Sequence, residues 1–224
     1  MPLTDETPPP RLPRPLDAVE LRVLGALLEK QQATPEYYPL TLHALAAACN
    51  QKTNRDPVTD LDEAAVLAAL ERLREHVLVW KTGGARAEKW EQNVDRRWSL
   101  DAGAKAVMTL LLLRGEQTPG ELRGRSERLH AFATPGEVEA ALQRLATGPE
   151  PLAAECARRP GQKESRWMHL AGGAVNVNVP QAAPSGPSRA AAPDVASRLD
   201  ALERTVAALA RDLNEMKKKP GEEP

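Results

Sequence analysis

The first part of the chain has the apolar spacing of helices, followed by the spacing of strands. Three stretches repeat apolar residues every three or four positions, as one buried helix face does: 16–31, 40–49 and 60–77. The apolar run 77–80 and the segment 88–92 then flank Gly83 and Gly84. That pattern is typical of a β-hairpin. We therefore predict three helices followed by a hairpin.

The same order recurs between residues 102 and 170. A long apolar helix is predicted over 102–114. The signatures Thr118-Pro-Gly-Glu121 and Thr134-Pro-Gly-Glu137 each supply an N-cap, a proline in the first turn and a glutamate at the third position of a further helix. Segments 152–157 and 164–170 flank a second turn and predict a second hairpin.

Short similarities between the two parts indicate a duplication. Residues 68–73 resemble 140–145, and Arg97-Trp98 resembles Arg166-Trp167. The spacings between such pairs differ, which we explain by an insertion at the polar loop 50–59 of the first copy. Asp60 and Glu63 form an expected capping box after this loop.

Three helices followed by a hairpin define the winged helix, in which the third helix contacts bases and the hairpin is the wing. We predict a mainly α fold with small β-hairpins (α+β): winged-helix domain 1 over 16–100 and winged-helix domain 2 over 101–173. The alternative is an unspecialised α+β domain.

The ends of the chain differ in composition from this body. Prolines dominate 1–15 and recur in 174–193, which predicts a disordered lead-in and a linker, and 220–224 is predicted to be a disordered end. Between them, 194–219 has a heptad pattern typical of a coiled coil, formed by Val195, Leu199, Leu202, Val206, Leu209, Leu213 and Met216. We expect a homodimer through this helix; the alternative is a helix that folds back on the body.

Composition narrows the function classes. The 224 residues carry 30 Lys+Arg against 31 Asp+Glu, so the net charge of −1 excludes an indiscriminate cationic coat on DNA. No apolar run is long enough for a membrane span, and the two cysteines are solitary. We expect a cytoplasmic protein with no membrane association.

Reactive groups do not converge in the sequence. The four histidines are far apart, and glycine-rich phosphate loops and nucleophile motifs are absent. We therefore expect no enzyme activity, no cofactor, no metal and no small-molecule ligand.

Basic residues cluster in the loops and hairpins, which favours contact with nucleic-acid phosphates. In the second copy seven cations against three carboxylates leave a local charge of +4. The predicted contacts across both copies are Gln51, Lys52, Asn54, Arg55, Arg86, Lys89, Arg123, Arg125, Arg128, Arg158, Arg159, Lys163 and Arg166. The alternative is an ordinary solvated surface, because the predicted third helices are acidic.

The loop 48–58 has two interpretations. Its Asn, Thr and Asp side chains can bond neighbouring backbone, and Pro57 stiffens its exit, which gives it a structural role. In the second interpretation Gln51, Lys52, Asn54 and Arg55 contact phosphates or bases.

Several motifs resemble those of the YceH-like bacterial family over about residues 16–172: Glu29-Lys-Gln31, Thr34-Pro-Glu36, Tyr38-Pro-Leu40, Ala48-Cys-Asn-Gln-Lys-Thr-Asn-Arg55, Leu111-Leu-Leu-Arg-Gly115, Gln117-Thr-Pro-Gly-Glu-Leu-Arg123, Arg159-Pro-Gly161 and Arg166-Trp-Met-His-Leu170. The resemblance implies paired winged-helix domains in a bacterial cytoplasm, and no biochemical function comes with it. Our leading hypothesis is a non-enzymatic DNA-binding protein that regulates transcription. The alternative is a protein-interaction adaptor built on paired winged helices.

Overall fold

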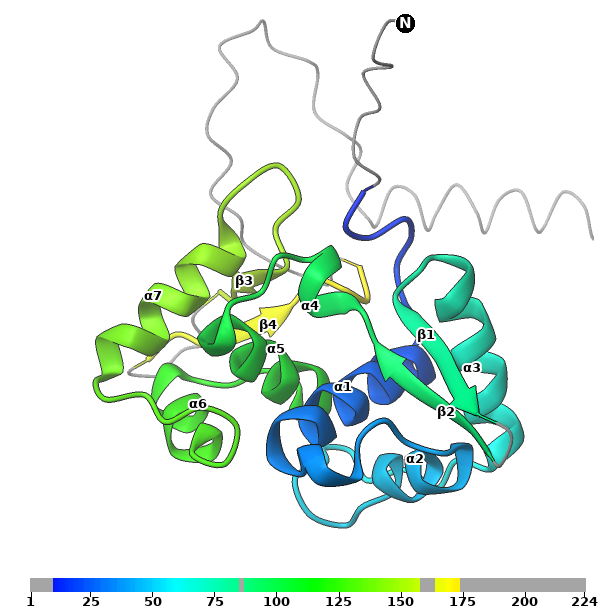
Figure 1. Ribbon diagram of the computed structural model, residues 1–224. Helices are drawn as coiled ribbons and strands as arrows, with labels where there is room; N and C mark the ends of the chain where they lie inside the picture. The colour runs from blue at the N-terminus through cyan, green and yellow to red at the C-terminus, as the bar shows by residue number, and fades with distance from the viewer. Residues whose placement is uncertain (1–9, 85–86, 158–163, 174–224) are drawn as a thin grey trace, which may run out of the picture. The chain divides into compact units, whose positions relative to one another are not determined.

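A computed structural model of the protein describes residues 10–84, 87–157 and 164–173 (Figure 1). Its first half places three helices before a hairpin: α1 (Ala18–Ala33), α2 (Leu42–Cys49), α3 (Glu63–Glu75), β1 (Val79–Gly84) and β2 (Ala87–Gln92). The second half repeats this order: α5 (Ala102–Arg114), α6 (Pro119–Ser126), α7 (Pro135–Ala146), β3 (Ala153–Glu155) and β4 (Trp167–His169). Two short helices were not expected: η1 (Pro35–Tyr37) and α4 (Val94–Arg97). The mixed class of helices and small hairpins is confirmed.

Both hairpins are antiparallel, and the first is the longer. β1 and β2 pair from Val79 opposite Gln92 to Gly84 opposite Ala87. The strands β3 and β4 are three residues each, with Ala154 opposite Met168 at the centre. None of the helices in the described part of the chain has the length and apolar character needed to cross a lipid bilayer.

In each half, a residue just before the second helix forms a β-bridge to the last strand of the hairpin. Leu40 exchanges two backbone hydrogen bonds with Trp90, at 3.1 and 2.7 Å, and Gln117 does the same with Trp167, at 3.0 and 2.8 Å. Both residues of the second pair lie 77 positions after those of the first. The structure therefore aligns Trp167 with Trp90, and our sequence alignment of Trp167 with Trp98 is wrong.

Side-chain caps fix where the helices begin. The capping box Thr118–Glu121 is confirmed: Thr118 Oγ1 accepts from the Glu121 N–H at 3.2 Å, and Glu121 Oε2 accepts from the Thr118 N–H at 2.9 Å. The box expected at Asp60 is wrong, because Asp62 caps α3 by accepting from the N–H of Ala65 at 2.7 Å. Thr134 occupies the N-cap of α7 but makes no side-chain cap bond.

One hydrophobic core runs through both halves, with α1 and α5 packed against each other between them (Figure 1). Helix α5 is buried on nearly every side from Gly103 to Leu113, as an apolar helix without a polar face must be. A Cβ atom added to Gly25 of α1 would lie 2.8 Å from Leu113 Cδ2. Glycine at this position therefore allows the two helix axes to approach closely.

The segment 10–15 is held by both halves. Trp98 Nε1 donates to the carbonyl of Arg11 at 2.9 Å, and the Arg11 N–H donates to Glu150 Oε2 at 2.8 Å. Leu12 packs against the core. The prediction of disorder is therefore wrong for these residues, while 1–9 lie outside the described chain.

Candidate nucleic-acid interface

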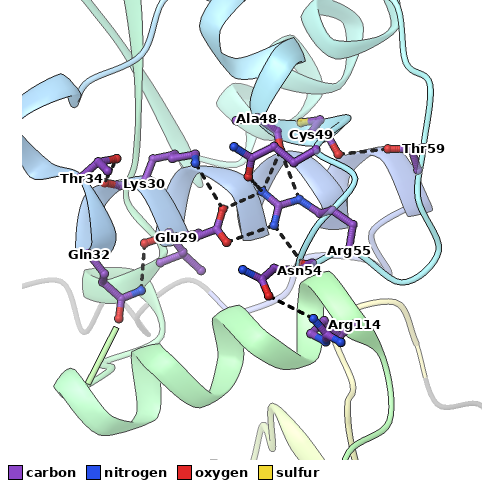
Figure 2. A network of polar contacts seen from close by, with 12 residues as sticks. Glu29, Lys30, Gln32, Thr34, Ala48, Cys49, Asn54, Arg55, Thr59 and Arg114 are labelled. Carbon is purple, nitrogen blue, oxygen red and sulfur yellow. Dashed lines mark hydrogen bonds and ion pairs between the residues drawn. The ribbon is translucent and has the colours of Figure 1, made fainter. Parts of the chain in front are cut away.

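Arg55, a predicted phosphate contact, lies in the interior (Figure 2). Its side chain has no exposed surface, and Nη1 and Nη2 donate to the two carboxylate oxygens of Glu29 on α1 at 3.1 and 2.6 Å. Nε and Nη2 also donate to the carbonyl of Ala48 at 3.1 and 2.7 Å. This bidentate, charge-assisted pair occupies the guanidinium. The burial and pairing of Arg55 favour the structural interpretation of this residue over the contact interpretation.

Other polar side chains of the loop fix its path. Asn50 Nδ2 donates to the carbonyl of Leu61 at 2.7 Å, and Asn50 Oδ1 accepts from the Leu61 N–H at 2.8 Å. Thr59 Oγ1 donates to the carbonyl of Cys49 at 3.1 Å (Figure 2). Asn54 has a φ of 59°, a left-handed conformation that asparagine tolerates. These bonds hold the loop against the end of α2.

The remaining predicted residues of this loop differ in exposure: Lys52 and Asn54 are exposed, and Gln51 is not. Gln51 is half-buried and accepts from Arg55 Nη2 at 3.2 Å. Lys52 is exposed and has no hydrogen bond or ion pair within the described residues. The loop therefore divides its cations: Arg55 points into the core and Lys52 stays in solvent.

In the second half four predicted arginines lie around α6, and three of them have hydrogen-bond partners within the protein. Arg125 Nη1 donates to Gln117 Oε1 at 2.8 Å, and Arg166 Nη2 donates to Glu121 Oε2 at 2.8 Å. Arg123 Nη2 donates to the carbonyl of Ala133 at 3.1 Å. Arg128 is exposed and has no polar partner in the described part of the chain. Of the four arginines, Arg128 is thus the most available to an external ligand.

A pocket of about 370 Å³ lies where the two halves meet, and we call it the junction pocket. Its lining comes from four segments: 29–34 at the end of α1, 51–54 of the loop, 110–113 of α5 and 125–129 at the end of α6. Four predicted contacts, Gln51, Asn54, Arg125 and Arg128, line it together. Residues far apart in the sequence therefore form one polar site.

The pocket also holds a lysine that the sequence analysis missed. Lys30 Nζ lies 3.7 Å from Glu29 Oε2, and Arg114 at the end of α5 donates to Asn54 Oδ1 at 3.2 Å (Figure 2). Lys30 and Arg114 each occupy the last turn of a helix. A basic residue is common there because it interacts favourably with the negative end of the helix dipole. That expectation gives no indication that Lys30 lines a pocket or that Arg114 contacts one of its lining residues, Asn54.

The third helices present little positive charge. The solvent-facing side chains of α3 include Glu63 and Glu75, and its Arg74 pairs with Glu71 at 2.7 Å. On α7, Arg144 pairs with Asp101 at 3.0 Å. The excess of cations is therefore at the junction pocket and not on the helices expected to contact bases.

The hairpin segments contribute two described cations among the predicted contacts, Lys89 and the Arg166 already placed beside α6. Lys89 is exposed on β2. The other predicted residues lie outside the described chain: Arg86, Arg158, Arg159 and Lys163 of the hairpin tips, and Val195, Leu199, Leu202, Val206, Leu209, Leu213 and Met216 of the heptad segment.

Two repeats of three helices and a hairpin, sharing one core and a basic pocket, define a duplicated mixed α/β protein. The chain belongs to the DUF480 family, described as "Protein of unknown function", whose model matches residues 16–162. This confirms the expected membership in a bacterial family of uncharacterised function.

Similar proteins come from several bacteria. A UPF0502 protein of Burkholderia multivorans is 44% identical over 204 residues, covering 91% of this chain and 87% of the relative. A UPF0502 protein of Acidovorax sp. is 45% identical over 202 residues, covering 88% and 90%. A third, of Burkholderia orbicola, is 47% identical over 174 residues, covering 78% and 74%.

Proposed function

We propose that the chain is a tandem winged-helix protein that binds DNA, catalyses no reaction and regulates transcription in the bacterial cytoplasm. The observation that carries the proposal is the convergence of Lys30, Arg125 and Arg128 on one pocket. Lys52 is exposed and lies in sequence between two further lining residues of this pocket, Gln51 and Thr53. Cations gathered from separate segments on one surface are what phosphate contacts require.

Two features support the winged-helix assignment. The order of three helices and a hairpin occurs twice. In both halves a residue between the first two helices pairs with the last strand, through Leu40 with Trp90 and Gln117 with Trp167. A third strand-like segment at the same place in each half favours two copies of one winged module over an unspecialised domain.

The distribution of charge favours backbone contacts over base contacts. The third helices expose glutamates, which repel phosphate, so they do not dock in a major groove as they stand. The junction cations therefore contact phosphates. Lys89, exposed on β2, is a further phosphate contact in this proposal. Arg158, Arg159 and Lys163, which lie outside the described residues, are proposed contacts from the sequence alone. The heptad segment 195–216 joins two chains, which doubles the number of contacts.

Fluorescence anisotropy with a labelled 30-base-pair duplex at 50 mM salt tests the proposal with the full chain. We expect saturable binding that weakens about tenfold or more in the Lys52→Ala/Arg128→Ala double variant, since two phosphate contacts are removed. Arg74→Ala on α3 is the matched control and keeps wild-type affinity. The triple variant Arg158→Ala/Arg159→Ala/Lys163→Ala tests the hairpin contribution. Absence of binding at this salt concentration would overturn the proposal.

One observation favours the adaptor role as the second candidate. Leu67 is 37% exposed on α3, on a helix whose solvent-facing charges are mainly acidic. An apolar residue with acidic neighbours suits a basic, apolar protein partner. If the duplex does not bind and Leu67→Asp abolishes a stoichiometric, nuclease-resistant complex from native lysate, the adaptor role replaces DNA binding.

A further inference from the structure

The junction pocket has the features of a small-molecule site, independently of any DNA contact. Leu110 and Leu113 of α5 and Leu129 after α6 supply apolar lining, while Lys30, Arg125 and Arg128 supply charge. Its volume of about 370 Å³ falls in the lower part of the range typical of ligand sites, about 300–1,000 Å³. We propose that this pocket binds a small phosphate monoester with an apolar body.

The balance of charge favours a doubly negative head group. The carboxylate that lines the pocket, Glu29, is neutralised by Arg55, which holds both of its oxygens. Glu121 lies 3.6 Å from Arg125 Nη2, but it also pairs with Arg166 at 2.8 Å. With Glu29 matched by Arg55 and Glu121 matched by Arg166, the three lining cations remain in excess. A phosphate monoester, which carries close to two charges at neutral pH, matches this excess better than a carboxylate with one charge.

The C-terminal ends of helices carry a partial negative charge, which disfavours the binding of an anion. The pocket lies at the ends of α1, α5 and α6, each of which carries a partial negative charge of about one half. The carbonyl of Lys30 accepts from the N–H of Thr34 at 3.1 Å, and the carbonyl of Leu113 accepts from Asp56 at 2.9 Å. Because these carbonyls are capped, the full charges of the side chains dominate the field at the pocket.

One of the cations is held in place by a buried amide. Gln117 is 1% exposed; its Nε2 donates to the carbonyl of Leu110 at 3.0 Å, and its Oε1 accepts from Arg125 Nη1 at 2.8 Å. Gln117 is thus a positioning residue, because it fixes the Arg125 guanidinium next to the pocket before a ligand arrives. A preoriented guanidinium loses less side-chain freedom on binding phosphate.

Isothermal titration of the full chain with phenyl phosphate, in the absence of DNA, tests this proposal. Phenyl phosphate combines the dianionic head with a small apolar body, so we expect saturable binding. Benzoate, phenol and inorganic phosphate each lack one feature and should bind at least about tenfold more weakly. Arg128→Gln should weaken the binding of phenyl phosphate at least about tenfold. Arg74→Gln, which changes an exposed cation on α3, should leave the binding unchanged.

Two results would overturn the proposal: no saturation by 10 mM phenyl phosphate, or equal affinity in the wild type and in Arg128→Gln. Arg128 has no polar partner among the described residues, so the variant should fold, and circular dichroism checks that it does. A chain that binds DNA without binding phenyl phosphate overturns this inference alone. The reverse result overturns the proposed function alone.

Discussion

The two halves share one order of elements and differ in how the second helix is joined to the third. In the first half a long loop, 50–62, is fixed by the buried ion pair of Arg55 with Glu29. In the second half the shorter connection 127–134 buries Phe132 instead, and its nearby ion pair, Arg166 with Glu121, is partly exposed. The longer loop of the first half is thus stabilised by buried polar contacts, whereas the shorter connection of the second half relies on a buried aromatic side chain.

The largest expected effect comes from breaking the two ion pairs separately. Arg55→Ala leaves the Glu29 carboxylate buried without its partner, which should lower the free energy of unfolding by about 3–5 kcal/mol. Arg166→Ala removes a pair whose side chains are 26% and 33% exposed, so the loss should be about 1 kcal/mol. Urea denaturation measures both. Equal losses would show that the loop network is not what distinguishes the halves.

The second comparison is between the acid sensitivity of two carboxylates, Glu20 at the start of α1 and Asp101 at the start of α5. Burial raises the pKa of Glu20, but hydrogen bonds from Arg14, the Asp17 N–H and Arg72 outweigh it and hold the pKa at about 2. A lowered pKa stabilises the fold above pH 4.5, and this contribution is lost as the pH falls towards 2. Glu20→Gln should lower the free energy of unfolding at pH 7 by about 2 kcal/mol and flatten its decline between pH 4.5 and 2.

The matched change at α5 should be milder. Asp101 caps α5 and pairs with Arg144, and both side chains are about half exposed. Asp101→Asn keeps a capping side chain and loses only the exposed pair, so less than about 1 kcal/mol should be lost. Acid titrations followed by circular dichroism compare the two variants; an acid profile of Glu20→Gln that overlays the wild type would contradict the prediction.

Close packing between the halves can be tested at glycines. Gly25→Ala places a Cβ 2.8 Å from Leu113, so the free energy of unfolding should fall by about 1–3 kcal/mol. Gly124→Ala on α6 meets nothing within 4 Å and should raise it by about 0.5–1 kcal/mol. Thermal or urea unfolding distinguishes them. A Gly25→Ala variant as stable as the wild type would mean that α1 and α5 are less tightly packed.

The smallest expected effect compares the caps of the two third helices. Asp62→Ala removes a cap bond of 2.7 Å and should cost about 1 kcal/mol, whereas Thr134→Ala removes none and should cost a few tenths. Urea midpoints measured on both variants test this order. The reverse order would show that the side chain of Thr134 caps α7 in solution.

Periodicity and capping signatures predicted most of the helices and both hairpins, because these depend on local sequence. Helix α4 was missed, since its four residues are too few to show a period. The partner of Arg55 was also missed, because Glu29 lies 26 residues away on a helix. One signal was present: Glu29 falls at the end of an otherwise mostly apolar stretch, where a buried carboxylate requires a cation.

The junction pocket could be predicted only in its parts. Gln51, Asn54, Arg125 and Arg128 were expected to contact phosphates, yet nothing local indicated that they come together. Their convergence follows from the packing of α1 against α5, which depends on a glycine and on long-range apolar contacts. Lys30 was missed because a basic residue in the last turn of a helix is common for the helix dipole alone.

The salt dependence of duplex affinity tests the central claim most directly. If Lys52 and Arg128 contact phosphates, the logarithm of the binding constant should fall linearly with the logarithm of the salt concentration. The slope of the Lys52→Ala/Arg128→Ala variant should be shallower by about 2 per chain. Arg74→Ala should keep the wild-type slope. Equal slopes for the wild type and the double variant would contradict the assignment of the junction cations to phosphate binding.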